Sequence, residues 1–308
     1  MTTLSKRSLL KLGAASISLA AVGLPAFAQN IDELVIANNV SLPSWDPTVG
    51  LSAVNPTLQG MYQSVFDLFI AQDTDLSQVP GIVTEWGWND DKSQIFMTVR
   101  EGVKWHDDTD LTPEDVVWSL ETAADPDGGN PIQFIWSTVG NFQIDGQRIT
   151  ADVLRFEPTI FKWMSFLTGY VRPKAYIERV GAEGFEAAPI GSGPYMVEKY
   201  ERNAFVRLKA FGDYWGPKPE FESVTIKFVT DAAARVAEVE SGNAHVTLEM
   251  PYEEFDRLKA GKLEGVAHPV SDIAMIFFND IEVMTDPNVR KAAVMAVDKQ
   301  AIVDRLLS

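Results

Sequence analysis

The first 28 residues limit what this chain folds into, because they have the pattern of a cleavable export signal. Lys6, Arg7 and Lys11 supply a basic start, residues 12–24 form a weakly apolar stretch, and the segment ends in Ala26-Phe27-Ala28. Cleavage is expected after Ala28. The folded protein therefore begins near residue 29 and lies outside the cytoplasm, and a Gram-negative periplasm is the simplest location.

The type of signal stays open at this point. Residues 5–11 resemble a twin-arginine signal with Lys6 in the place of the first arginine, and this difference leaves the ordinary secretory route open. A membrane anchor is the weaker interpretation. Residues 12–24 are shorter than the ~20 residues that span a bilayer, and Gly23 and Pro25 interrupt them.

The chain has no cysteine. It therefore folds without disulfides, and it has no zinc–thiolate site, iron–sulfur cluster, thiol nucleophile or lipoprotein-type anchor. Its stability must come from an apolar core, and 46% of the residues are hydrophobic and 10% aromatic. We expect a globular monomer without a cofactor.

The charge argues against nucleic acid as a partner. The formal net charge is −17, and the export segment holds three of the cations and no acid, so the remainder is more acidic still. Such a surface repels phosphate backbones and anionic lipid.

Helical and strand patterns are mixed without strict alternation, which predicts an α/β or mixed α+β fold. Strands are expected over residues 31–37, 94–100, 148–156, 205–210 and 223–229. Helices are expected over residues 56–69, 112–123, 159–167 and 231–241, with one more starting at Asp286-Pro287 and a last one capped by Asp298. Residues 42–55 contain several Pro and Gly and are expected to be loop.

The residues offer little catalytic chemistry. His106, His245 and His268 fit no metal-ligand spacing, and His106-Asp107-Asp108 is interpreted as a solvated turn. Gly191-Ser192-Gly193 is interpreted as a tight backbone turn, because a nucleophile elbow needs a different frame. The acidic run is taken as the solvent-facing side of a helix; it comprises Glu249, Glu253, Glu254 and Asp256.

Two of the eight tryptophans, Trp45 and Trp136, fall in expected loops. Exposed loop aromatics are typical of ligand clefts. Packing in the core is the alternative for each ring, because tryptophan buries a large apolar area.

Several blocks resemble the family 5 extracellular solute-binding proteins, the dipeptide, oligopeptide and nickel-complex receptors of ABC importers. The most specific is Arg100-Glu101-Gly102-Val103-Lys104-Trp105-His106-Asp107-Asp108, preceded by Pro80-Gly81-Ile82-Val83 and followed by Thr112-Pro113-Glu114-Asp115. Further blocks follow in order at residues 189–195, 214–219, 231–242, 277–279, 286–292 and 296–302. The resemblance covers nearly all of residues 31–308.

The chain departs from the family pattern at Asp108, where Gly is usual, and at His245, where Asp is common. Aspartate tolerates a left-handed turn, so the loop at Asp108 is expected to survive, whereas a packing or cap role at position 245 is expected to be lost. Family members are also much longer, which predicts a fragment or a truncated gene product.

The resemblance implies a type II-like periplasmic binding protein fold of two lobes, the second incomplete. Lobe I would comprise residues 29–55 and 186–270, with residues 56–185 as an inserted subdomain. Residues 271–308 would start lobe II. A ligand would bind between the lobes and a hinge would close over it.

The implied function is a periplasmic substrate-binding component, not an enzyme, that passes a peptide-like solute or metal chelate to an ABC permease. The expected ligand-binding residues are Trp45, Leu51, Ser52, Ala53, Phe134, Trp136, Arg172, Phe278 and Asn279. Arg172 is a candidate partner for a ligand carboxylate, with a plain surface charge as the alternative.

Three other hypotheses remain. The same fold serves in sensory or chaperone-like binding modules. An exported hydrolase that uses paired carboxylates is less favoured, because no nucleophile–base pair is recognised in the sequence. An inert fragment would expose apolar surface around residues 276–278 and aggregate.

Overall fold

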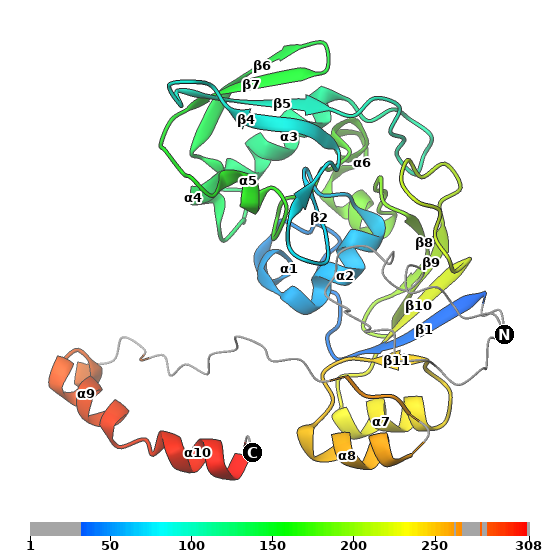
Figure 1. Cartoon of the computed structure of the whole chain (residues 1–308), viewed down its shortest axis with the longest axis vertical. Coiled ribbons are helices and arrows are strands. Elements are labelled where there is room, and N and C mark those ends of the chain that lie inside the picture. Colours follow the sequence, from blue (N-terminus) through cyan, green and yellow to red (C-terminus); the bar gives the residue numbers. More distant parts are fainter. Residues whose placement is uncertain (1–31, 262, 267–277, 279–281, 307–308) are drawn as a thin grey trace. The chain divides into compact units, whose positions relative to one another are not determined.

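The computed structural model describes residues 32–261, 263–266, 278 and 282–306 (Figure 1). The expected export segment and Asn279 lie outside these residues. The chain divides into two compact units, one up to Glu249 and one from Met250 onward. Within the described part, no helix combines the length and apolar character that a membrane crossing requires.

The first unit contains a five-stranded sheet in the order β11-β1-β10-β9-β8. The strands are β1 (Glu33–Asn38), β8 (Tyr195–Glu201), β9 (Phe205–Ala210), β10 (Ser223–Phe228) and β11 (Val246–Thr247). β1 pairs in parallel with β10 and β11, whereas β10, β9 and β8 pair in antiparallel. Alternation along β10 buries Val224, Ile226 and Phe228 on one face, as the sequence predicts.

Two helices flank this sheet. α7 (Ala232–Glu240) packs against β1 and β11, and α2 (Pro56–Val65) packs against β8. The expected cap of α7 is confirmed, because the Asp231 carboxylate accepts a hydrogen bond from the Ala234 amide at 2.8 Å.

A second, antiparallel sheet of four strands has the order β4-β5-β7-β6. Its strands are β4 (Val83–Trp88), β5 (Gln94–Val99), β6 (Val139–Asp145) and β7 (Arg148–Val153). The helices α3 (Pro113–Ala124), α4 (Gln133–Trp136) and α5 (Ile160–Trp163) accompany this sheet. Helix α6 (Lys174–Ala187) packs its apolar residues into the core of the five-stranded part, and β2 (Ala71–Gln72) and β3 (Gln78–Val79) form a separate two-stranded sheet. α3 packs against β6, β7, α4 and α6 (Figure 1).

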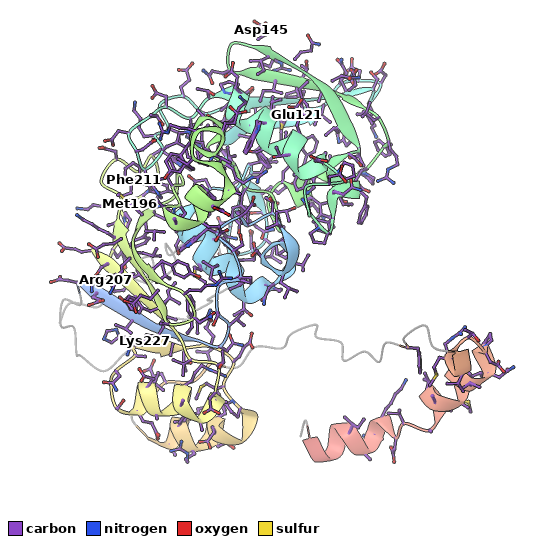
Figure 2. All side chains as sticks on the ribbon, turned by 180° about the vertical axis from the view of Figure 1, so that it is seen from behind. Glu121, Asp145, Met196, Arg207, Phe211 and Lys227 are labelled. Carbon is purple, nitrogen blue, oxygen red and sulfur yellow. The ribbon has the colours of Figure 1, made fainter. Side chains whose placement is uncertain are left out.

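Each sheet has its own apolar core. In the four-stranded part, Met97 and Ile149 pack with Val116 of α3. In the five-stranded part, Leu208 and Val224 belong to a separate cluster that includes Tyr62 of α2. Charged residues instead line the exposed side of the five-stranded sheet. Arg207, labelled in Figure 2, pairs with Glu33 at 3.2 Å and with Glu198 at 2.8 Å.

The loop that carries His106 docks on the turn at Gly191–Gly193. The His106 amide donates to the Gly191 carbonyl (2.9 Å), and the Gly191 amide donates to Nδ1 of the ring (3.0 Å). Because Nδ1 accepts, Nε2 holds the proton and donates to the Gly193 carbonyl at 3.0 Å. The ring packs edge-on against Phe211, and burial lowers the pKa of His106 to about 4. Residues 106–108 do form a turn and Asp108 is exposed, as expected, but the His106 ring is buried, so the interpretation is wrong for that side chain.

The Gly191–Gly193 turn is as tight as expected, and it also meets Asp67. A side chain at position 191 would place its Cβ 1.9 Å from the Val65 carbonyl oxygen. The Asp67 carboxylate accepts hydrogen bonds from Ser192 Oγ (2.8 Å), Trp215 Nε1 (2.9 Å) and Tyr214 Oη (3.2 Å). Burial raises the pKa of Asp67 to about 6. We call Asp67, His106 and residues 191–193 the joint.

The structure shows the conformation and contacts of Asp108 and His245, the two positions at which the chain departs from the family pattern. Asp108 has a φ of +66°, so the left-handed turn survives without glycine. His245 is still engaged: its Nδ1 accepts a hydrogen bond from the Val35 amide at 2.9 Å, and its own amide donates to the Val35 carbonyl.

Other expectations need correction. The expected loop at 42–55 contains a short helix, α1 (Gly50–Val54). Glu249 is not helical: it has a φ of +51°, and its carboxylate accepts hydrogen bonds from Asn39 and from Thr57 Oγ1.

The second unit consists of helices among its described residues. They are α8 (Tyr252–Ala260), a 3₁₀ turn (Glu282–Met284), α9 (Pro287–Met295) and α10 (Lys299–Leu306). The predicted caps are confirmed: Asp286 accepts from the Asn288 amide and Asp298 from the Ala301 amide. Helix α9 buries none of its residues, and Met295 is 75% exposed.

Candidate ligand-binding site

Three large apolar side chains are exposed on the first unit near the residues that the sequence indicated. Leu51 on α1 is 72% exposed, Phe134 on α4 is 51% exposed, and Phe166 after α5 is 43% exposed. We call these three residues the apolar rim. Apolar side chains left in water are available to a ligand or a partner surface.

Hydrogen bonds connect the segments that carry the apolar rim. The Gly50 amide donates to the Gly129 carbonyl at 3.1 Å, which ties the start of α1 to the loop before α4. Trp136 Nε1 donates to Thr168 Oγ1 at 2.8 Å, which ties α4 to the turn after α5. The rim residues therefore come from separate segments held in place by polar contacts.

The remaining predicted residues of this region are buried. Trp45 is fully buried and packs edge-on against Tyr200, and Trp136 is 1% exposed. The packing alternative therefore describes both rings, and the expectation of exposed loop aromatics is wrong for them. Ser52 and Ala53 are also buried, and Ser52 Oγ approaches the Ser44 carbonyl at 3.5 Å.

Arg172 is buried and paired. Its Nη1 lies 2.6 Å from Asp46 Oδ2, and its guanidinium lies 5.0 Å from the ring centre of Trp118. The Asp46 carboxylate also accepts hydrogen bonds from the amide and the hydroxyl of Thr48. The surface-charge alternative for Arg172 is wrong, and its charge already has a partner within the protein.

The last two predicted residues belong to the second unit. Phe278 is half-buried, and Asn279 lies outside the described residues. Within the first unit, the structure brings together the segments that carry the predicted residues. Sequence reasoning did not single out Asp46 or Phe166, since neither belongs to a motif.

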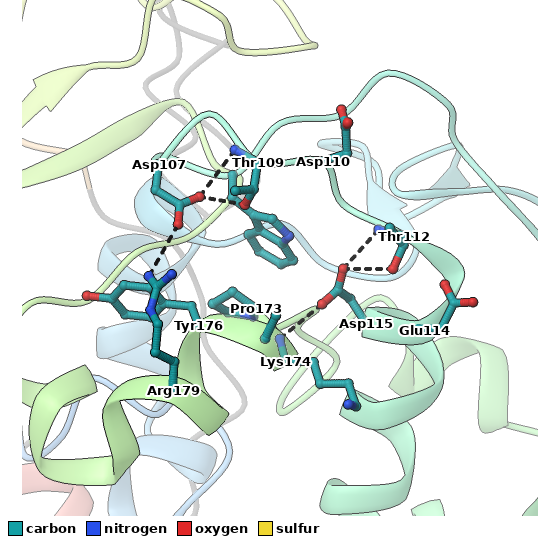
Figure 3. Close-up of a pocket in the computed structure, with 12 residues that line it drawn as sticks. Asp107, Thr109, Asp110, Thr112, Glu114, Asp115, Pro173, Lys174, Tyr176 and Arg179 are labelled. Atoms are coloured by element: carbon teal, nitrogen blue, oxygen red, sulfur yellow. Dashed lines mark hydrogen bonds and ion pairs between the residues drawn. The ribbon is translucent and has the colours of Figure 1, made fainter.

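A cavity of about 280 Å³ lies between the loop at 105–112 and the start of α6 (Figure 3). Several of its polar groups are used internally. Asp115 accepts hydrogen bonds from the amides of Thr112 and Lys174, and Asp107 accepts from Thr109 and lies 3.8 Å from Arg179. These contacts hold the starts of α3 and α6 together, so the groups that make them serve the fold. The described residues contain no group of three or more His, Cys, Asp or Glu side chains that suits a metal ion.

The sequence model of the bacterial extracellular solute-binding proteins, family 5, matches residues 77–308. The chain belongs to this family. The resemblance found in the sequence blocks is therefore confirmed.

Curated relatives in the family carry binding names. The glutathione-binding protein GsiB of Salmonella typhi is 29% identical over 299 residues, which cover 95% of this chain and 57% of GsiB. The dipeptide-binding protein of Escherichia coli K12 is 25% identical and covers 98% of this chain and 60% of its own length. The chain thus spans less than two thirds of the length of these relatives.

Several solved structures share the fold of this chain. NikZ from Campylobacter jejuni, solved with Ni(L-His), superposes with a TM-score of 0.75 at 23% identity and covers 90% of this chain and 55% of NikZ. The oligopeptide-binding protein AppA from Bacillus subtilis, solved with a nonapeptide, gives a TM-score of 0.74 at 19% identity and covers 89% and 55%. The expected fold class, mixed α/β of the periplasmic binding protein type, is confirmed.

Proposed function

We propose that this family 5 chain serves as the substrate-binding component of an ABC importer in the periplasm, where it captures a peptide-like solute or a metal chelate and delivers it to a membrane permease. The observation that carries the proposal is the family match over residues 77–308. The relatives named for binding glutathione and dipeptides, and the Ni(L-His) in the NikZ structure, support the ligand classes.

The apolar rim suits binding rather than bond chemistry. Leu51, Phe134 and Phe166 present apolar contact area, and the segments of Phe134 and Phe166 are tied by the hydrogen bond from Trp136 to Thr168. A site with an apolar lining and few polar groups holds a small ligand by excluding water. We therefore propose that the chain binds its solute unchanged and is not an enzyme.

The proposed domain organisation follows the two sheets. We propose lobe I as residues 29–55 and 186–270. The five-stranded sheet, whose strands lie before residue 56 and between residues 195 and 247, supports this division up to residue 247, and the second compact unit begins at Met250. The four-stranded sheet lies within the proposed inserted subdomain, residues 56–185. Residues 271–308 would contribute to lobe II.

Thermal unfolding of the purified chain with a ligand panel tests the proposal. The panel contains dipeptides, longer peptides, glutathione and nickel–histidine. A ligand that binds only the folded state stabilises it by about 2.7 kcal/mol at a hundredfold excess over Kd. We expect one ligand class to raise the unfolding midpoint. A midpoint that no member of the panel shifts would contradict binding by this chain.

A further inference from the structure

We infer that Arg172 is a positioning residue of the proposed ligand site: it holds the segment 44–54, which carries Leu51, against α3, and it does not itself grip a ligand carboxylate. The inference rests on the proposed function for the identity of the site. The link between the segment and α3 stands on contacts within the first unit alone.

Arg172 is held on α3 by three residues in one stretch of that helix. Its backbone amide donates to Ser119 Oγ at 2.9 Å, and its Nη2 donates to Thr122 Oγ1. Its guanidinium also lies over the Trp118 ring. Because its backbone amide, its Nη2 and the face of its guanidinium all contact α3, the arginine has little freedom to turn toward another partner.

Asp46 is the matching contact on the other side. Its Oδ2 lies 2.6 Å from Arg172 Nη1, and its Oδ1 accepts from the Thr48 amide (2.9 Å) and the Thr48 hydroxyl (2.6 Å). The same carboxylate thus shapes its own segment and connects that segment to α3. The chain resumes as α1 two residues after Thr48 and exposes Leu51.

Burial decides between positioning and direct binding. Arg172 is only 5% exposed, and a ligand carboxylate would have to displace Asp46 and leave it buried and unpaired, which is strongly unfavourable. Nε is the one guanidinium nitrogen of Arg172 that has no hydrogen-bond partner among the described residues, and it is buried. Direct contact with a ligand would have to use Nε or the second N–H of Nη1 or Nη2, so the test must separate the two roles.

The first arm of the test needs no ligand. Amide hydrogen exchange is measured in the full chain and in Asp46→Asn, Arg172→Met, the double variant and Arg172→Lys. Lys174→Met is the matched control. Lys174 lies two residues after Arg172 and forms an exposed ion pair with Glu178. We expect exchange in residues 46–54 to rise about tenfold or more in either single variant, while strands β9 and β10 keep their protection.

The double variant and the lysine variant sharpen this arm. Because both single changes break the same link, the double variant is expected to exchange no faster than the single variants. Arg172→Lys keeps the charge and should restore most of the protection. Since Asp46→Asn/Arg172→Met leaves no unpaired charge, it keeps the test informative if Arg172→Met does not fold. Unchanged exchange in 46–54, additive effects, or a loss of protection throughout the chain would overturn the inference.

The second arm compares the dipeptide Met-Leu with its C-terminal amide as probes of the same variants. Positioning predicts that Arg172→Met weakens binding of both probes by the same factor. A loss confined to the free carboxylate would show direct contact and overturn the inference. If the unaltered chain binds neither these probes nor any member of the ligand panel, the proposed function fails, and the exchange arm still decides the role of Arg172.

Discussion

At the joint, both ring nitrogens of His106 have hydrogen-bond partners and the residue is 8% exposed, whereas at the apolar rim Leu51 is 72% exposed. Both places lie where distant segments of the first unit meet. At the joint the segments are held together by buried hydrogen bonds, whereas at the rim apolar side chains are exposed to water.

The difference separates stability from function. Buried, satisfied polar groups are costly to disturb, because each lost partner leaves a desolvated donor or acceptor. Exposed apolar side chains contribute little to folding, and those on segments that are tied together are available for contact with a ligand. Substitutions at the joint should therefore affect the free energy of unfolding, and substitutions at the rim should affect binding.

The largest effect is expected for Gly191→Ala. The new Cβ would lie 1.9 Å from the Val65 carbonyl oxygen, so the turn and the end of α2 must move apart. We expect a loss of about 4 kcal/mol or more in the free energy of unfolding, measured by urea denaturation. Gly212→Ala is the control, because nothing lies within 4 Å of its Cβ. A Gly191→Ala variant as stable as this control would show that the joint is not tightly packed.

His106→Ala should come next. It leaves the Gly191 amide and the Gly193 carbonyl buried without their partner, at a cost of about 2–4 kcal/mol in the free energy of unfolding. His245→Ala is matched to it, because its ring also accepts a backbone amide but lies in an exposed position, and about 1 kcal/mol or less is expected. Equal losses in the two histidine variants would remove the distinction between the joint and an ordinary surface contact.

Acid is expected to change the stability of the joint in two opposite ways, one through His106 and one through Asp67. Burial lowers the pKa of His106 from 6.5 to about 4, so the unfolded chain binds that proton first, and stability is lost as pH falls from 6.5 to 4. Burial raises the pKa of Asp67 from 3.8 to about 6, so the folded chain binds that proton first, and stability is gained as pH falls from 6 to 4. Each effect amounts to about 3 kcal/mol when complete, and the two nearly cancel.

Removing one of the two groups should reveal the pH dependence of stability that the other contributes. Relative to the unaltered chain, Asp67→Asn should lose stability more steeply between pH 6.5 and 4, and His106→Ala less steeply. Urea denaturation at several pH values measures both, and differences from the unaltered chain cancel the titration of other carboxylates. Three parallel curves would mean that neither group titrates as its burial requires.

Local signals in the sequence predicted the framework of the fold well. The strand expected at 205–210 has the bounds of β9, and the helix after Thr112 is α3, where Asp115 accepts the Thr112 amide as a capping carboxylate does. Helix α6 was missed because Phe185 is its only buried residue and Gly181 interrupts it with a φ of +72°. A helix with so small a buried face gives no periodic signal.

The site was less predictable, because its burial comes from residues far away in the sequence. Leu51 and Phe134 were indicated through the family resemblance, and the structure exposes both. The position of Arg172 depends on Asp46, 126 residues earlier, and that of His106 on glycines 85 and 87 residues later. No local pattern predicts such partners, so a buried pair was interpreted as a ligand contact or a surface charge, and a buried ring as a solvated turn.

The smallest effect on stability is expected at the apolar rim, and it is the one that tests function. Leu51→Ala and Phe134→Ala remove side chains that are more than half exposed, so the free energy of unfolding should change by no more than about 0.5 kcal/mol. Binding of the ligand class that shifts the midpoint should weaken about tenfold for each, since a partly buried apolar contact is worth about 1.4 kcal/mol. Leu76→Ala is the control, because Leu76 is 70% exposed and lies on the β2–β3 turn outside the rim. If all three variants bind alike, the rim is ordinary surface. If the rim variants also lose free energy of unfolding, their side chains belong to the core, and the contrast with the joint disappears.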